Sequence, residues 1–226
     1  MTNELIFFAI ALIDLVFVLI ASRLGMRWLF VSIVLNLLMI SIFGGKLVSR
    51  FGFVSNSGNV FYACVFFATQ LIVEYYGKKE AEKSILLGAT AVIFFVIMSQ
   101  LVVLTIGTPE TRIVSIAMDT LFKAVPRVVA ASIVAYLVSQ TVNINLFSYL
   151  SNKWKKKMLF LRVNLTNIVG QSVDSVIFFA IAFYGVIPNT NLVQAIFAGY
   201  VIKIAVGFFS SIFFQLSGPP PVLRED

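Results

Sequence analysis

The residues best suited to chemistry lie inside an apolar segment, "NLTNIVGQSVDSVIFFAIAFY" at positions 164–184. On a helical wheel its polar side chains share an arc of about 100°, and they are Asn164, Asn167, Gln171, Asp174 and Ser175. A carboxylate at the centre of a membrane helix costs about 2.5–3.5 kcal/mol to insert, so this stripe cannot face lipid. We expect it to face the interior of a helix bundle and to bind a polar ligand.

The stripe also has a structural interpretation. Amides and hydroxyls join neighbouring membrane helices through hydrogen bonds of about 0.6 kcal/mol each. This alternative is open for Asn164 or Ser175 taken alone. It is weaker for the whole stripe, because an ionisable side chain in mid-membrane indicates a functional site by default.

A second charge lies in the next apolar segment, Lys203 in "AGYVIKIAVGFF". Asp174 and Lys203 are equally far along the chain from the middle of the "GVIPNTN" loop, so on antiparallel helices they lie at the same depth. We expect them to pair, either as a permanent structural contact or as charges shared with a bound ligand. Ala195, Gly199 and Gly207 form a stripe of small residues that predicts close approach of a neighbouring helix.

A third group lies in "ATQLIVEYYGKKEAEKS", where Gln70 and Glu74 share one helix face at i and i+4. Glu74 lies near a helix end, so a carboxylate that reaches interfacial water is the alternative. Arg162 lies beside the "KKK" loop. Taken alone, it would be interpreted as a snorkelling basic residue on the cytoplasmic side of the membrane. The candidate substrate-binding residues are therefore Gln70, Glu74, Arg162, Asn164, Asn167, Gln171, Asp174 and Lys203.

Other polar residues inside the apolar segments are interpreted as helix contacts: Asp14, Asn36, Gln100, Gln140 and Asn143. The chain has no histidine and one cysteine, Cys64, which excludes an internal disulfide, a His/Cys metal site and a histidine-based catalytic triad. We expect no metal ion and no cofactor.

The elements that position these residues are membrane helices. The chain has 226 residues, of which 60% are hydrophobic and 12% charged, far from the composition of soluble domains. The apolar runs reach the ~20 residues that a helix needs to cross a bilayer. The net charge of +7 comes from basic residues in the loops between them, which indicates membrane topology rather than nucleic-acid binding.

The sequence predicts an all-α integral membrane protein, a single bundle of about seven transmembrane helices. The predicted spans are 5–22, 28–48, 58–76, 85–106, 126–149, 160–185 and 191–214, separated by loops such as "RFGFVSNSGN" and "GKKEAEKS". "SIAMDTLFKAVPR" is predicted as a short interfacial helix on the outer face. The N-terminus has no typical cleavable signal peptide.

Basic residues orient the bundle. With the N-terminus outside, the cytoplasmic side receives ten: Arg23, Arg27, Lys78, Lys79, Lys83, Lys153, Lys155, Lys156, Lys157 and Arg224. The outer side receives five: Lys46, Arg50, Arg112, Lys123 and Arg127. This bias predicts a multi-pass protein of the plasma or inner membrane with a cytoplasmic C-terminus.

Three segments together resemble the VUT family of vitamin uptake transporters, whose characterised members are queuosine precursor transporters. They are "FATQLIVEYYGKKEAEKSI", "RVNLTNIVGQSVDSVIFFAIAFYG" and "GYVIKIAVGFF". The resemblance implies uptake of 7-cyano-7-deazaguanine or its aminomethyl relative, for tRNA modification. Many members have aspartate where this chain has Gln70.

The fold that the resemblance implies is similar to the six-helix substrate-binding component of energy-coupling-factor (ECF) vitamin transporters. Residues 1–27 then form an extra N-terminal helix and loop, residues 28–214 the six-helix core, and residues 215–226 a short tail. The expected partner is a small-molecule ligand. Asp174 or Glu74 would accept hydrogen bonds from its guanine-like edge, while Asn167 and Gln171 would form hydrogen bonds with its carbonyl and ring nitrogens.

Three alternatives stay open beside a self-sufficient transporter. The chain could serve as the binding subunit of an ECF-type vitamin transporter, with a separate ATPase module, since it has no Walker motif. An intramembrane enzyme using Glu74 and Asp174 is disfavoured by the lack of a nucleophile motif, and a scaffold by the number of buried polar groups. The sequence leaves open the energy coupling and whether the protein forms a homo-oligomer.

Overall fold

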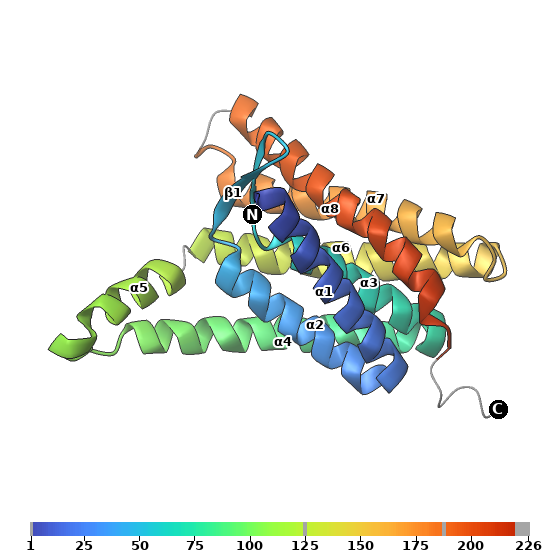
Figure 1. The fold of residues 1–226 in the computed structure, drawn as a ribbon, viewed down its shortest axis with the longest axis horizontal. Helices are drawn as coiled ribbons and strands as arrows, with labels where there is room; N and C mark the ends of the chain where they lie inside the picture. The colour runs from blue at the N-terminus through green and yellow to red at the C-terminus, as the bar shows by residue number, and fades with distance from the viewer. Residues whose placement is uncertain (1, 124–125, 187–188, 220–226) are drawn as a thin grey trace.

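The computed structural model describes residues 2–123, 126–186 and 189–219, most of which are helical (Figure 1). The long helices are α1 (Asn3–Leu24), α2 (Met26–Phe43), α3 (Asn59–Tyr76), α4 (Lys78–Val103), α6 (Pro126–Lys153), α7 (Leu159–Phe183) and α8 (Asn189–Ser217). The short elements are strands β1 (Leu47–Arg50) and β2 (Phe53–Asn56), the 3₁₀ turn η1 (Pro109–Thr111) and helix α5 (Arg112–Phe122).

Six of the described helices are long and apolar enough to cross a membrane: α1, α2, α4, α6, α7 and the part of α8 from Ile196. They confirm the prediction of an all-α, multi-pass membrane protein. The predicted third span is α3, an 18-residue helix whose polar residues lower its hydropathy. Every residue of α3 from Tyr62 to Val73 is buried, so α3 needs little of the apolar surface that lipid contact demands of the other helices.

α3 lies at the centre of the bundle, where it packs against α1, α2, α4, α6 and α8. The long helices alternate in direction, so the described part of the chain has two ends (Figure 1). We call them the hairpin end, which carries β1 and β2, and the basic-loop end, which carries residues 154–158. α1, predicted as an addition to a six-helix core, packs against α2, α3 and α8. Residues 220–226 of the predicted tail lie outside the described residues.

Two reversals of direction depend on single glycines. Gly25 joins α1 to α2 with φ 111°, and Gly77 joins α3 to α4 with φ 88°, conformations that side chains disfavour. The predicted loop "GKKEAEKS" is wrong, because α4 begins at Lys78. Lysine and glutamate are good helix formers, and ion pairs one turn apart support this start: Lys78–Glu82 at 3.5 Å and Lys83–Glu80 at 2.6 Å.

The predicted loop "RFGFVSNSGN" contains a β-hairpin, and α2 ends at Phe43 rather than at 48. Its turn places Phe51 and Gly52 at positive φ. The hairpin is fastened to the start of α1: the Asn3 amide donates to the carbonyl of Ser49 at 3.1 Å, and the Phe51 N–H donates to Glu4 at 3.2 Å.

Helix α5 matches the predicted interfacial helix in position, and none of its residues is buried. It projects from the bundle at the hairpin end and forms a V with α4 (Figure 1). Its location at a membrane surface stays a prediction.

Candidate functional site

Buried polar side chains follow one another along the inner faces of α3, α6, α7 and α8. On α3 the residues of this inner face recur every four positions: the polar residues Tyr62, Gln70 and Glu74, with the apolar Phe66 between them. Each of these four residues faces residues of α7 at the same depth. The result is an internal polar axis with an ion pair at each end.

The lysine pair, Asp174 with Lys203, lies toward the hairpin end. The Lys203 Nζ is 2.5 Å from Asp174 Oδ2, and the two side chains are only 7% and 6% exposed. The ammonium also lies 4.9 Å from the ring centre of Tyr62, and the Ser139 hydroxyl is 3.5 Å from Asp174 Oδ1. The pairing predicted from equal depth is confirmed, and its charges are removed from lipid.

The arginine pair, Glu74 with Arg162, lies at the basic-loop end. The guanidinium is fully buried and binds both carboxylate oxygens, at 2.7 and 3.2 Å. It also donates to the Ser151 hydroxyl at 2.8 Å and, at 3.0 Å each, to the carbonyls of Lys156 and Lys157. One side chain of α7 thus joins the ends of α3 and α6. Arg162 is fully buried rather than snorkelling, whereas Glu74 keeps 13% exposure near the end of α3, so its interpretation as an interfacial carboxylate stays an alternative.

Between the pairs lies the amide layer, which we define as Gln70, Gln140, Asn143, Asn167 and Gln171. The Gln70 amide nitrogen donates to the side-chain oxygens of Asn143 and Asn167, at 3.0 Å each. Asn167 in turn donates to the carbonyl of Gly207 on α8 at 3.1 Å. The small residue at Gly207 permits this close approach, as the stripe on α8 predicts.

The part of the amide layer nearest the lysine pair has unused hydrogen-bonding groups. Along α6, Gln140 lies between Ser139, which contacts Asp174, and Asn143, whose amide donates to Gln140 Oε1 at 3.3 Å. Along α7, Gln171 follows Gly170, which lies against the Phe66 ring. The buried side-chain atoms here with no hydrogen-bond partner among the described residues are Gln171 Oε1 and Nε2, Gln140 Nε2, Gln70 Oε1 and Ser175 Oγ. Leaving a buried polar group unpaired costs about 1–3 kcal/mol, so these atoms are candidates for hydrogen bonds to a ligand.

Phe66 contributes an aromatic ring to the same inner face of α3 as Gln70. Its ring packs against Gly170 of α7, where an added Cβ would overlap the ring. A flat heterocycle placed here would have an aromatic face to stack on and amides along its edge. Gln70 and Gln171 are fully buried, so the site is closed to solvent in this conformation.

One candidate binding residue lies outside the polar axis, and two residues of the amide layer are not among the predicted binding residues. Asn164 is half-buried, and its amide donates to the carbonyl of Phe160 in its own helix at 2.8 Å. The sequence alone suggests that Gln140 and Asn143 are single helix contacts, yet both belong to the amide layer. The spacing of Ser139, Gln140 and Asn143 on one face of α6 is the signal that would have found them.

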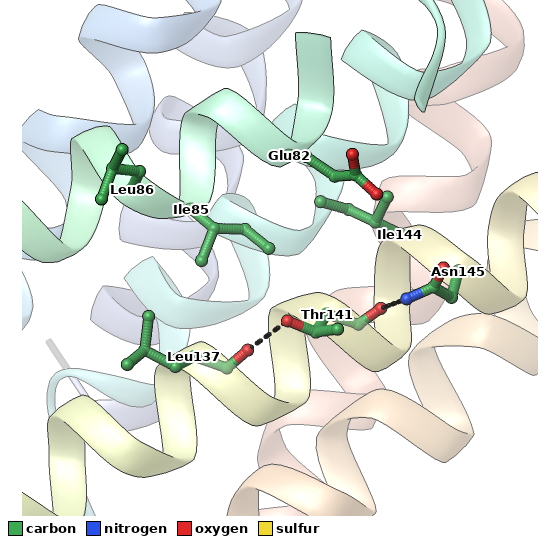
Figure 2. A pocket seen from close by; sticks show the side chains of 7 residues that line it. All are labelled: Glu82, Ile85, Leu86, Leu137, Thr141, Ile144 and Asn145. Atoms are coloured by element: carbon green, nitrogen blue, oxygen red, sulfur yellow. Dashed lines mark hydrogen bonds between the residues drawn. The ribbon is translucent and has the colours of Figure 1, made fainter. Parts of the chain in front are cut away.

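The pocket in Figure 2 lies elsewhere, between α4 and α6, with a volume of about 330 Å³. None of the candidate binding residues lines it. Its Thr141 hydroxyl donates to Leu137 O and its Asn145 amide to Thr141 O, so both donors are used within α6. Apart from Glu82, the lining therefore offers little for recognising a polar ligand.

Comparison with known proteins identifies the family. Residues 56–217 match the family described as "Putative vitamin uptake transporter". A curated protein of Bacillus subtilis (strain 168), named "Probable queuosine precursor transporter", is 33% identical over 166 residues, which cover 73% of this chain and 72% of the relative. No solved structure matches the chain, so the likeness to ECF binding components stays an expectation.

The match includes the amide layer and both ion pairs, and it extends over well more than half of the chain. With the apolar helices and the closed polar site, the conclusion is that this chain belongs to the Vut_1 family of vitamin uptake transporters.

Proposed function

We propose that the protein imports a 7-deazapurine, 7-cyano-7-deazaguanine or its aminomethyl relative, without converting it chemically. Family membership and the name of the Bacillus relative support transport of this class of molecule. The observation that carries the proposal is the set of buried amide atoms at Gln140 and Gln171 that have no hydrogen-bond partner among the described residues. This set suits a flat ligand with donors and acceptors along its edge.

The chemistry of a guanine-like edge matches these groups. Its N1–H and exocyclic amine donate, and its carbonyl and ring nitrogens accept. The Gln171 amide offers one acceptor and two donors, and Gln140 Nε2 adds donors. Both carboxylates of the axis are held by cations here, so direct recognition by Asp174 or Glu74 requires an ion pair to open.

The two ion pairs also suit alternating access. The arginine pair joins α3, α6 and α7 at the basic-loop end, and the lysine pair joins α7 to α8 nearer the hairpin end. Opening either contact would expose the amide layer to one side only. In this proposal the structure is the occluded state, and the amide layer binds the ligand near mid-membrane.

The basic residues support an orientation for this transport. We place the basic-loop end in the cytoplasm and the N-terminus outside, in the plasma or inner membrane, because the loops at the basic-loop end carry most of the lysine and arginine. A membrane-impermeant maleimide applied to intact cells tests the orientation in a Cys64→Ala background. It should label Lys46→Cys and not Lys155→Cys; the reverse pattern would overturn the orientation.

Solute counterflow tests the function without assuming an energy source. Proteoliposomes loaded with unlabelled 7-cyano-7-deazaguanine should transiently accumulate the labelled compound from outside, and guanine or vitamins inside should not support this. Accumulation only with a vitamin would overturn the substrate. Accumulation only after an ATPase module is added would favour the binding-subunit alternative.

A further inference from the structure

A third buried carboxylate lies outside the polar axis. Asp14 is at the middle of α1 and 8% exposed. Its Oδ1 accepts from the amide of Asn36 on α2 at 3.1 Å, and that amide also donates to the carbonyl of Ser32 at 3.0 Å. The thiol of Cys64 on α3 lies beside the carboxyl. Asp14 Oδ2 is buried without a hydrogen-bond partner among the described residues.

Asp14 differs from the other two buried carboxylates because no cation binds it within the described part of the chain. Glu74 has Arg162 and Asp174 has Lys203. Of the elements packed against α1, α3 presents the Cys64 thiol and α2 the Asn36 amide.

Among the described residues, no ion pair or hydrogen bond joins Asp14 to the other charged groups of the elements around α1. Lys203 of α8 is bound to Asp174, and Arg50 of β1 lies over Phe7 near the start of α1. Arg27, at the start of α2, is exposed.

An ionised carboxylate in this position would have the Asn36 amide and the weakly donating Cys64 thiol beside it but no counter-charge among the described residues. In a medium of low dielectric constant this arrangement favours the neutral form. We propose that Asp14 is a proton-binding site: it holds a proton in the closed conformation and releases it when α1, α2 and α3 separate. Only the O–H bond forms and breaks, and water on either side of the membrane supplies and accepts the proton.

A proton fits this cluster better than a metal cation does. Calcium takes 6–8 oxygen ligands, and magnesium needs an octahedral set. Few oxygen atoms are available here to bind a metal ion, because Asn36 turns its amide nitrogen rather than its oxygen toward the carboxyl. Cys64 adds a thiol rather than an oxygen.

The site is placed to act on the amide layer through α3. Cys64 lies on the side of α3 toward Asp14, and Phe66 and Gln70 lie on the opposite side of the same helix. A movement of α3 that exposes the amide layer would therefore also alter the contact with Asp14. We infer that Asp14 couples uptake to the proton gradient; this coupling, unlike the protonation, rests on the proposed function.

Dicyclohexylcarbodiimide tests protonation without any variant, because this apolar reagent adds to protonated carboxyls within membranes. Peptide mass spectrometry of the labelled wild-type protein in liposomes should find the adduct at Asp14 and not at Asp174 or Glu74, whose ion pairs are internal controls. Once Asp14 is mostly ionised, each further pH unit should lower its labelling about tenfold. Absence of the Asp14 adduct at neutral pH, or protection by sodium at constant pH, would overturn the proton site.

Uptake driven by an inwardly directed proton gradient tests coupling. The gradient should accelerate 7-cyano-7-deazaguanine uptake by the wild type and by Asp119→Asn, which changes an exposed carboxyl on α5. It should not accelerate uptake by Asp14→Asn, which retains counterflow. Full acceleration in Asp14→Asn would refute the coupling. Failure of wild-type counterflow would refute the proposed function, while the labelling result would still decide protonation.

Discussion

Replacing Lys203 with methionine removes the ammonium that binds Asp174 and keeps most of the side-chain volume. The carboxylate would keep only uncharged polar neighbours, the Ser139 hydroxyl at 3.5 Å and the Tyr62 hydroxyl, and it is 6% exposed. Removing one partner of a buried ion pair costs about 3–5 kcal/mol, and loss of the contact with the Tyr62 ring adds about 0.5–2 kcal/mol. We therefore expect Lys203→Met to lower the free energy of unfolding by at least ~3 kcal/mol.

Unfolding in mixed detergent and dodecyl sulfate micelles, followed by tryptophan fluorescence, measures this change. Lys83→Met is the matched control: Lys83 pairs with Glu80 at 2.6 Å but is 65% exposed, so its loss should cost at most about 1 kcal/mol. The double variant Asp174→Leu/Lys203→Met should recover most of the stability, because it leaves no unpaired buried charge. A cost for Lys203→Met no greater than that for Lys83→Met would refute the buried pair.

Two further substitutions test the packing of the polar axis. Arg162→Lys should lower the free energy of unfolding by about 1–3 kcal/mol, because an ammonium keeps the charge but cannot make the two-pronged contact with Glu74 and leaves buried acceptors unpaired. Arg112→Lys, on exposed α5, should change it by less than about 0.5 kcal/mol. Gly170→Ala should cost about 1–3 kcal/mol by forcing the Phe66 ring from α7, whereas the new methyl of Gly45→Ala meets no atom within 4 Å and should be nearly neutral. Equal effects of a test variant and its control in the same unfolding assay would contradict the geometry.

The sequence was sufficient for the spans and for the lysine pair, because both depend on distance along the chain. Apolar runs separated by charged or glycine-containing breaks located every long helix, although α4 begins seven residues before its predicted start and α2 ends five residues before its predicted end. The short connection between the sixth and seventh predicted spans fixed the relative depth of Asp174 and Lys203. Depth alone could not reveal the partner of Glu74, because Arg162 is 88 residues away and its approach depends on how α3 and α7 pack.

Local composition was misleading where the same residues could form either a loop or a regular element. The charges after Gly77 resemble a loop, but at helical spacing they pair and begin α4. Residues 47–56 have the composition of a loop, but their contacts with α1 hold them as a hairpin. Asn164 shares the arc of the polar stripe, yet its own helix satisfies the amide nitrogen.

Ligand binding at the amide layer is tested most directly by thermal unfolding of the purified protein with 7-cyano-7-deazaguanine. A ligand at one hundred times its Kd should stabilise the native state by about 2.7 kcal/mol. The wild type and Asn164→Leu should both show the shift, and Gln171→Leu should lose it. An undiminished shift in Gln171→Leu would place the ligand elsewhere and contradict the proposed site.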